Sequence, residues 1–208
     1  NPGKIVDAPM MTENLRYGSD YQSVEPKTHF DFSPQGGFGR AIEMCNGVGE
    51  CRKMLAGTMC PSYMATRDEA DSTRGRANAL RAAISGQLEG GLTDPRVHDV
   101  LDLCLECKAC KSECPSNVDM AKLKYEFLAH YYAEHGTPLR AWVFGNIEAI
   151  NRLGCQFAPI SNWIAGSPLA KIGMKWLGIA EKRSLPPFAR PTLTSRLSRR
   201  TGMRSKKR

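Results

Sequence analysis

The stretch that decides the fold is Cys104-Leu-Glu-Cys107-Lys-Ala-Cys110-Lys-Ser-Glu-Cys114-Pro115. Its pattern is C-x2-C-x2-C-x3-C-P, in which three thiols recur at every third residue and a fourth precedes proline. This spacing is typical of chains that wrap three thiolates around one cuboidal iron–sulfur cluster, while the fourth thiolate reaches across to a second cluster. The run therefore predicts two electron-transfer clusters and a partner motif elsewhere in the chain.

Structural zinc and disulfide bonding explain this run less well. Structural zinc sites use two C-x2-C pairs, whereas here three cysteines stand in tandem. A disulfide framework needs an oxidising compartment, and the opening residues 1–7 lack the charged and apolar regions of a signal peptide. No window has the 18 or more apolar residues of a membrane span. We therefore expect a cytoplasmic protein that is soluble or peripheral at the inner membrane.

The net charge of +8 belongs to the end of the chain. Residues 182–208 contain ten Lys or Arg and no Asp or Glu, which leaves 19 basic and 21 acidic side chains, a net charge of −2, in the rest of the 208 residues. A charged tail is usually solvated, and weak attraction to an anionic membrane surface is a further expectation. Its single aromatic residue, Phe188, gives little support for stacking on bases, so no nucleic-acid partner is expected.

Helical periodicity and capping signals dominate the chain, and no strand-like alternation appears. Ser72, Asp94 and Asp119 each precede an apolar pattern at helical spacing, as N-capping residues do. The predicted class is therefore all-α. Helices are expected over residues 72–88, 95–103, 119–136, 138–151 and 161–178.

Composition divides the chain into four expected segments. Residues 1–40, rich in Pro, Gly, Ser and Asp, predict an extended connector from an upstream domain, because the chain opens without Met in a stretch that resembles the end of a domain. Residues 41–135 hold the cysteine motifs and predict an α-helical dicluster module. Residues 136–180 predict a helical extension, and residues 181–208 a basic, disordered tail.

The partner motif is Cys45-Asn-Gly-Val48-Gly-Glu-Cys51, followed after an insertion by Cys60-Pro61. Aligned with the first run, it has the first, third and fourth cysteines, and Val48 occupies the second position. The glycines on either side of Val48 allow positive φ, which brings backbone N–H groups towards cluster sulfur.

The crossing rule of such motifs then groups the cysteines. One 4Fe–4S cluster is assigned Cys60, Cys104, Cys107 and Cys110, and the second cluster is assigned the three thiolates of Cys45, Cys51 and Cys114.

Three other residues are candidates for the missing ligand of the second cluster. Cys155 is far from both motifs in sequence, and a lone cysteine is usually a small buried apolar residue. His130 and His135 follow the second motif on a predicted helix, where most histidines are solvated or hydrogen-bonded. The identity of this ligand stays open at the level of the sequence.

Three arginines between the motifs, Arg67, Arg74 and Arg76, are candidates for tuning the clusters. Positive charge and hydrogen bonds near cluster sulfur raise the reduction potential, so Arg74 and Arg76 are predicted to lie close to the clusters. The alternative is a salt-bridged start of a helix that involves the neighbouring acidic residues at positions 68, 69 and 71.

Longer stretches around these motifs resemble one bacterial family. They are C-N-G-V-G-E-C-R-K at 45–53, M-C-P-S-Y-M-A-T-R-D-E at 59–69, S-T-R-G-R-A-N at 72–78 and L-D-L-C-L-E-C-K-A-C-K-S-E-C-P-S-N-V-D-M-A-K-L-K at 101–124. The family is that of the fused FAD-linked oxidase/iron–sulfur proteins related to D-2-hydroxyglutarate, D-lactate and glycolate dehydrogenases. Separately, Val48 in place of the second cysteine resembles the 3Fe–4S motif of fumarate and succinate oxidoreductases. That resemblance implies a 3Fe–4S cluster, or a 4Fe–4S cluster with one non-cysteine ligand.

The family resemblance implies a division of labour. An upstream FAD-binding domain would oxidise a 2-hydroxy acid, and the clusters would relay electrons to a downstream cysteine-rich domain, a quinone or an electron-transfer protein. These 208 residues contain no Gly-rich phosphate loop after a strand and no residue that stands out as a general base, so the segment is expected to relay electrons only. The alternatives are a free-standing iron–sulfur subunit of a respiratory oxidoreductase and a nucleic-acid-binding iron–sulfur protein.

Overall fold

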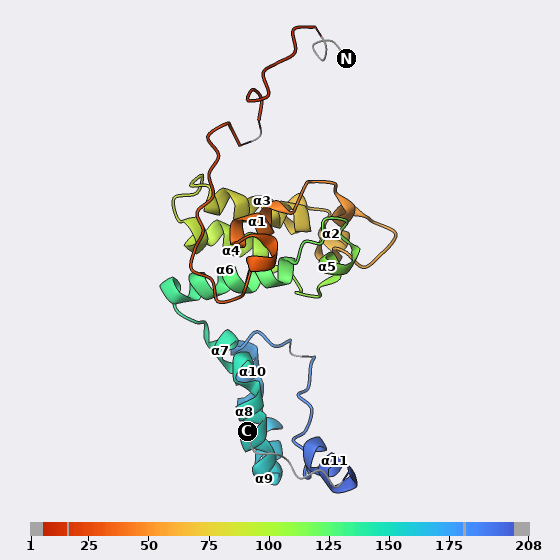
Figure 1. The fold of residues 1–208 in the computed structure, drawn as a ribbon. Coiled ribbons are helices and arrows are strands. Elements are labelled where there is room, and N and C mark those ends of the chain that lie inside the picture. Colours follow the sequence, from red (N-terminus) through yellow and green to blue (C-terminus); the bar gives the residue numbers. More distant parts are fainter. Residues whose placement is uncertain (1–5, 16, 181, 202–208) are drawn as a thin grey trace. The chain divides into compact units, whose positions relative to one another are not determined.

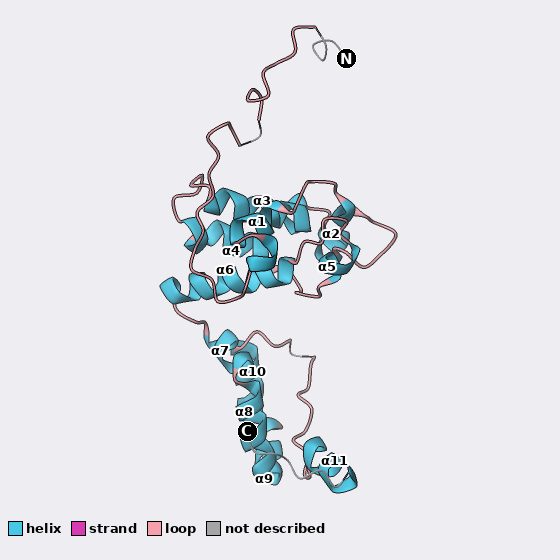
Figure 2. Cartoon of the chain, viewed as in Figure 1, coloured by secondary structure: helices cyan, strands magenta, loops and turns pink. Residues whose placement is uncertain are grey.

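The computed structural model describes residues 6–15, 17–180 and 182–201 (Figure 1). In the described part of the chain all regular structure is α-helical or 3-10 helical, without a strand (Figure 2), which confirms the predicted all-α class. The chain divides into two compact units, Asn1–Gly136 and Thr137–Arg208. No helix of the described residues combines the length and apolar character that are needed to cross a bilayer.

The first unit contains the two cysteine motifs. Its helices are α1 Phe38–Glu43, α2 Pro61–Thr66, α3 Thr73–Ile84, α4 Pro95–Asp102, α5 Ala109–Glu113 and α6 Met120–His135. Short 3-10 turns lie at η1 Ser33–Gln35, η2 Glu50–Arg52, η3 Glu69–Asp71 and η4 Gly91–Thr93.

The three main helices begin where the capping signals predict. The side chains of Ser72, Asp94 and Asp119 accept hydrogen bonds from backbone N–H groups in the first turns of α3, α4 and α6, respectively. The helix expected to continue to residue 88 is shorter, because α3 ends at Ile84 and Gly86 follows with φ of +77°. A glycine in the left-handed region ends a helix without the cost that a side chain would bring.

A small apolar core lies among α1, α3, α4 and α6, which pack against one another (Figure 1). Leu80 of α3, Leu101 of α4 and Phe127 of α6 are fully buried within it. Fully burying an aliphatic or aromatic side chain contributes about 1.5–3 kcal/mol. This core holds the ends of the helices in fixed positions, and the cysteine loops begin at those ends.

The connector is fastened to the first unit. The Val24 N–H donates to the carbonyl of Ile84 at 2.8 Å, and the Glu25 carboxylate accepts from the N–H groups of Phe38 and Gly39 at the start of α1, each at 2.9 Å. The ring of Phe32 belongs to the core. Residues 24–32 therefore pack against the first unit as a fixed segment rather than as a free linker.

The second unit contains α7 Leu139–Gly145, α8 Ile147–Gln156, α9 Ala158–Ala165, α10 Pro168–Trp176 and α11 Leu193–Thr201. The two helices expected at 138–151 and 161–178 are thus divided into four. Pro159 and Pro168 each lie in the first turn of a helix, where the missing N–H of proline costs nothing. Within the tail expected to be disordered, α11 is helical; residues 202–208 lie outside the described part.

Candidate iron–sulfur centres

Four cysteines, drawn from both motifs, line one cavity, which we call the four-cysteine cavity. Its cysteines are Cys60, Cys104, Cys107 and Cys110. Cys60 is the N-cap residue of α2, Cys104 follows the end of α4, and Cys110 lies in α5. Cys60 is 44 residues from Cys104 in sequence, and the two line one cavity because the core fixes the helix ends beside one another.

The loop that carries three of these cysteines is held by a buried lysine. Lys124 of α6 donates from Nζ to the carbonyl oxygens of Cys104 at 2.9 Å and Asp102 at 3.3 Å, and it forms an ion pair with Glu106 at 3.0 Å. Glu106 and Lys108 both adopt positive φ, which curls the loop around the cavity. Sequence reasoning did not single out Lys124, because a lysine at a helical position is usually solvated.

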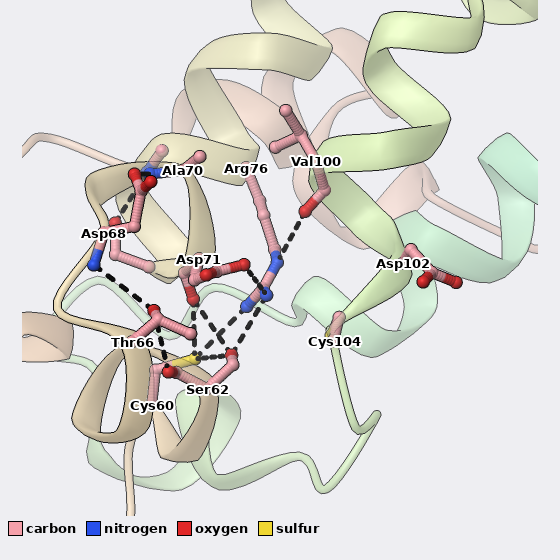
Figure 3. A network of polar contacts seen from close by, with 12 residues as sticks. Cys60, Ser62, Thr66, Asp68, Ala70, Asp71, Arg76, Val100, Asp102 and Cys104 are labelled. Atoms are coloured by element: carbon pink, nitrogen blue, oxygen red, sulfur yellow. Dashed lines mark hydrogen bonds and ion pairs between the residues drawn. The ribbon is translucent and has the colours of Figure 1, made fainter.

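Arg76 of α3 lines the four-cysteine cavity and is fully buried. Its side chain points towards Cys60, Ser62 and Asp71 (Figure 3). Its Nη1 donates to the sulfur of Cys60 at 3.3 Å. Its Nη2 donates to Ser62 Oγ at 3.0 Å and contacts the Asp71 carboxylate at 3.4 Å, while Nε donates to the Val100 carbonyl at 3.1 Å. The guanidinium therefore joins a candidate cluster ligand to a buried acid.

This network changes the acidity of the Cys60 thiol. Burial alone would raise the pKa of Cys60, but the hydrogen bond with Ser62 and the charge of Arg76 outweigh burial and lower it below the usual value. Burial raises the pKa of Cys104 and of Cys110. A thiolate is the form of cysteine that binds metal, and the contacts of Cys60 favour that form.

The remaining three motif cysteines line a second cavity, the three-cysteine cavity. Cys45, Cys51 and Cys114 contribute to it, together with Val48. Gly47 and Gly49 have φ of +80° and +84°, as expected for this loop. Val48 is 57% exposed. The cysteines are thus grouped in the same two sets that the crossing rule predicts.

Arg74 lines the three-cysteine cavity. Its backbone N–H donates to the sulfur of Cys51 at 3.4 Å, and its side chain donates to the carbonyl of Gly47 at 3.3 Å and to Glu69 at 2.7 Å. Burial raises the pKa of Cys51. Arg74 and Arg76 therefore form salt bridges near the start of α3, with Glu69 and Asp71 respectively. The two arginines also line the cysteine cavities.

Met59 and Thr73 line both cavities, so the two cavities are neighbours. Both residues are buried. The chain before Met59 is held by Glu113 of α5, which accepts hydrogen bonds from the N–H groups of Thr58 and Met59. Neither Met59 nor Glu113 carries a signal in the sequence, because their role depends on where the two motifs meet.

The other candidate ligands belong to α6 and α8. Cys155 belongs to α8 in the second unit, where it lines a recess with Arg152 and Pro191. His135 of α6 is hydrogen-bonded to the carbonyl of Tyr131 at 3.1 Å. His130 lies beside Glu126 at 3.4 Å. Neither histidine is among the residues that line the three-cysteine cavity.

The donor sets fit iron–sulfur clusters. Thiolates are the ligands that such clusters use, and four of them complete a 4Fe–4S cluster. The four-cysteine cavity offers four thiols from four positions around one space. The three-cysteine cavity offers three thiols and a valine at the position where a fourth would be.

Comparison with known proteins agrees with this geometry. Residues 41–118 match the family model described as a 4Fe–4S dicluster domain. The chain is 24% identical to D-2-hydroxyglutarate dehydrogenase of Escherichia coli (strain K12) over 95% of this chain and 23% of that protein. It is 27% identical to D-2-hydroxyglutarate dehydrogenase of Pseudomonas putida over 50% of this chain and 14% of that protein.

A second kind of relative is the glycolate oxidase iron–sulfur subunit of Escherichia coli (strain K12), which is 37% identical over 28% of this chain and 14% of that protein. No solved structure matches the chain. The chain spans about a quarter or less of the length of the curated relatives it matches. Residues 41–118 are therefore similar to a 4Fe–4S dicluster domain, and the chain is similar to D-2-hydroxyglutarate dehydrogenases and to glycolate oxidase iron–sulfur subunits.

Proposed function

We propose that this chain is the electron-transfer segment of a flavin-dependent 2-hydroxyacid dehydrogenase. In this role it takes electrons from an FAD-binding domain outside the chain and passes them one at a time to a downstream acceptor. The observation that carries the proposal is the pair of neighbouring cysteine cavities, which have Met59 and Thr73 in common. Two clusters held side by side in buried protein form a relay for single electrons.

The ligand sets follow the two cavities. Cys60, Cys104, Cys107 and Cys110 would hold a 4Fe–4S cluster. Cys45, Cys51 and Cys114 would hold a 3Fe–4S cluster, or a 4Fe–4S cluster with one ligand that is not cysteine. The position of Val48 in the lining of the three-cysteine cavity supports the smaller cluster, because an isopropyl group cannot bind iron.

Arg76 and Arg74 would set the potentials of the two clusters. The guanidinium of Arg76 donates a hydrogen bond to the sulfur of Cys60, and the backbone N–H of Arg74 donates to the sulfur of Cys51. Hydrogen bonds to sulfur and nearby positive charge favour the reduced, more negative state. The buried guanidinium of Arg76 acts in a medium of low dielectric constant, where its charge has more effect than at the surface.

The proposed acceptors are a downstream cysteine-rich domain, a quinone or an electron-transfer protein. A glycolate oxidase relative carries the words iron–sulfur subunit in its name, which favours a second arrangement in which the segment docks on a separate flavoprotein. Both arrangements give the segment the same chemistry.

The proposal is tested with the 208-residue chain, reconstituted anaerobically with iron and sulfide. Chemically reduced free flavin is expected to reduce the clusters, and a quinone analogue is expected to reoxidise them, as followed by visible absorption and electron paramagnetic resonance. A chain stripped of its clusters serves as the control and should not mediate transfer. Bleaching of the clusters by D-2-hydroxyglutarate, D-lactate or glycolate without any flavoprotein would contradict the proposal, because the segment would then contain its own dehydrogenase site.

A further inference from the structure

A third group of metal-binding side chains lies away from both cysteine cavities. His29 of the connector meets Glu126 and His130 of α6, and one ligand atom from each of the three lies within 4.8 Å of the other two. Glu126 and His130 are separated by four residues, so they project from the same face of the helix. The group therefore bridges the connector and the longest helix of the first unit.

The distances fit a tetrahedral metal ion. His29 Nδ1 lies 3.2 Å and His130 Nε2 lies 3.4 Å from the same oxygen, Oε1 of Glu126. With metal–ligand bonds of about 2.0–2.1 Å, a tetrahedral zinc site has ligand–ligand separations of about 3.3–3.4 Å. Two of the three ligand–ligand distances in this group are therefore already close to those of a tetrahedral site.

The carboxylate is held in place by groups other than the histidines. Glu126 has a fully buried side chain. Its oxygens accept hydrogen bonds from the backbone N–H groups of His29, at 2.9 and 3.1 Å, and Phe30, at 3.0 Å. Such bonds fix the direction of a carboxylate ligand.

His130 supplies an independent observation. Its Nε2 is buried and makes no hydrogen bond, although it lies 3.4 Å from Oε1 of Glu126. A buried polar atom without a partner costs about 1–3 kcal/mol. An ion placed between Nε2 and the Glu126 oxygen would satisfy it, since neutral imidazole nitrogen is a common ligand of zinc.

We propose that His29, Glu126 and His130 form a binding site for a divalent transition-metal ion, with Zn²⁺ as the best match in ligand type and spacing. His29 is 69% exposed, so water has access to the fourth position. Because His29 belongs to the connector and Glu126 and His130 belong to α6, the ion would link the connector to α6. The inference is independent of the proposed electron-transfer function.

The test uses the full chain with its iron–sulfur clusters loaded, so that the cysteines are occupied. Zinc is titrated calorimetrically into this protein in metal-free buffer, with iron content measured before and after. One equivalent of Zn²⁺ is expected to bind without loss of iron. His29→Ala, at an exposed position that leaves the core intact, should weaken binding by about tenfold or more, the range seen when metal sites lose a supporting contact.

His135→Ala is the matched control. It removes a histidine from the same helix at a residue outside the proposed site and should leave zinc affinity unchanged. His130→Ala provides a second ligand variant and should weaken binding as His29→Ala does. X-ray absorption at the zinc edge should give only nitrogen and oxygen neighbours, at about 2.0–2.1 Å.

Three results would overturn the proposal. The first is no zinc uptake by the loaded chain. The second is uptake that both His29→Ala and His130→Ala leave unchanged. The third is a sulfur shell at about 2.3 Å, which would place the zinc on cysteine. Any of them would mean that Glu126 holds the connector through hydrogen bonds and binds no metal.

Discussion

Replacement of Arg76 tests whether a buried charge sets the potential of one cluster. The perturbation is Arg76→Gln, which keeps an amide that can donate to Ser62 but removes the positive charge that lies 3.3 Å from the sulfur of Cys60. Because the guanidinium favours the added electron, we expect the potential of the cluster at the four-cysteine cavity to fall.

The size of this fall follows from Coulomb's law. A unit charge about 6 Å from the added electron, at an effective dielectric constant of about 20, stabilises the electron by about 3 kcal/mol. That corresponds to about 120 mV, because about 1.4 kcal/mol equals about 59 mV for one electron. The Asp71 carboxylate, 3.4 Å from Nη2, opposes part of the effect, so the expected fall is about 50–100 mV.

The assay is a redox titration of the reconstituted chain followed by electron paramagnetic resonance. Arg96→Gln is the matched control, since Arg96 is an exposed arginine that forms an ion pair with Asp94 and lines neither cysteine cavity. Asp71→Asn should shift the potential upwards, and it preserves the test if Arg76→Gln does not retain its cluster. Potentials that stay at the wild-type value in both Arg76→Gln and Asp71→Asn would refute the reasoning.

Three further predictions concern the framework of the first unit. Phe127→Ala removes a fully buried ring and should lower the free energy of unfolding by about 3–5 kcal/mol. The loss is measured as a lower urea midpoint of the helical circular dichroism signal. As a control, Tyr125→Ala, which changes an exposed ring, should lower the free energy of unfolding much less. Ser72→Ala removes the N-cap of α3 and should cost about 1 kcal/mol in the same assay, whereas an unchanged midpoint would show that the cap is dispensable. Gly49→Ala puts a side chain at φ of +84°, which costs about 1–2 kcal/mol of backbone strain. The spectra should show less of the cluster at the three-cysteine cavity and an unchanged 4Fe–4S signal from the other cavity. Equal loss of both signals would contradict a local effect.

Most of what could be predicted from the sequence rests on the cysteine spacing and on the N-capping residues of the helices. The spacing of Cys104, Cys107 and Cys110 is a local property of one loop, and the crossing of Cys60 and Cys114 follows from a rule about paired motifs. The starts of α3, α4 and α6 were predicted for a similar reason. A cap is decided by the few residues that surround it.

The parts that could not be predicted depend on contacts between distant residues. Lys124 looks like any helical lysine until the carbonyl of Cys104 is found beside it. Met59 acquires its place between the cavities only when both motifs fold around it. The breaks between α7 and α8 and between α9 and α10 were not predicted, because apolar periodicity continues across them; Pro168 begins α10.

The central claim is that the two motifs exchange their last cysteines, and one measurement tests it most directly. Cys60→Ser and Cys114→Ser are each reconstituted, and the two cluster signals are quantified by electron paramagnetic resonance with iron counting. The account predicts that Cys60→Ser perturbs the 4Fe–4S signal of the motif at 104–110 and spares the other cluster, while Cys114→Ser does the reverse. If Cys114→Ser instead damages the cluster of its own motif and Cys60→Ser damages that of Cys45 and Cys51, the crossed assignment is wrong.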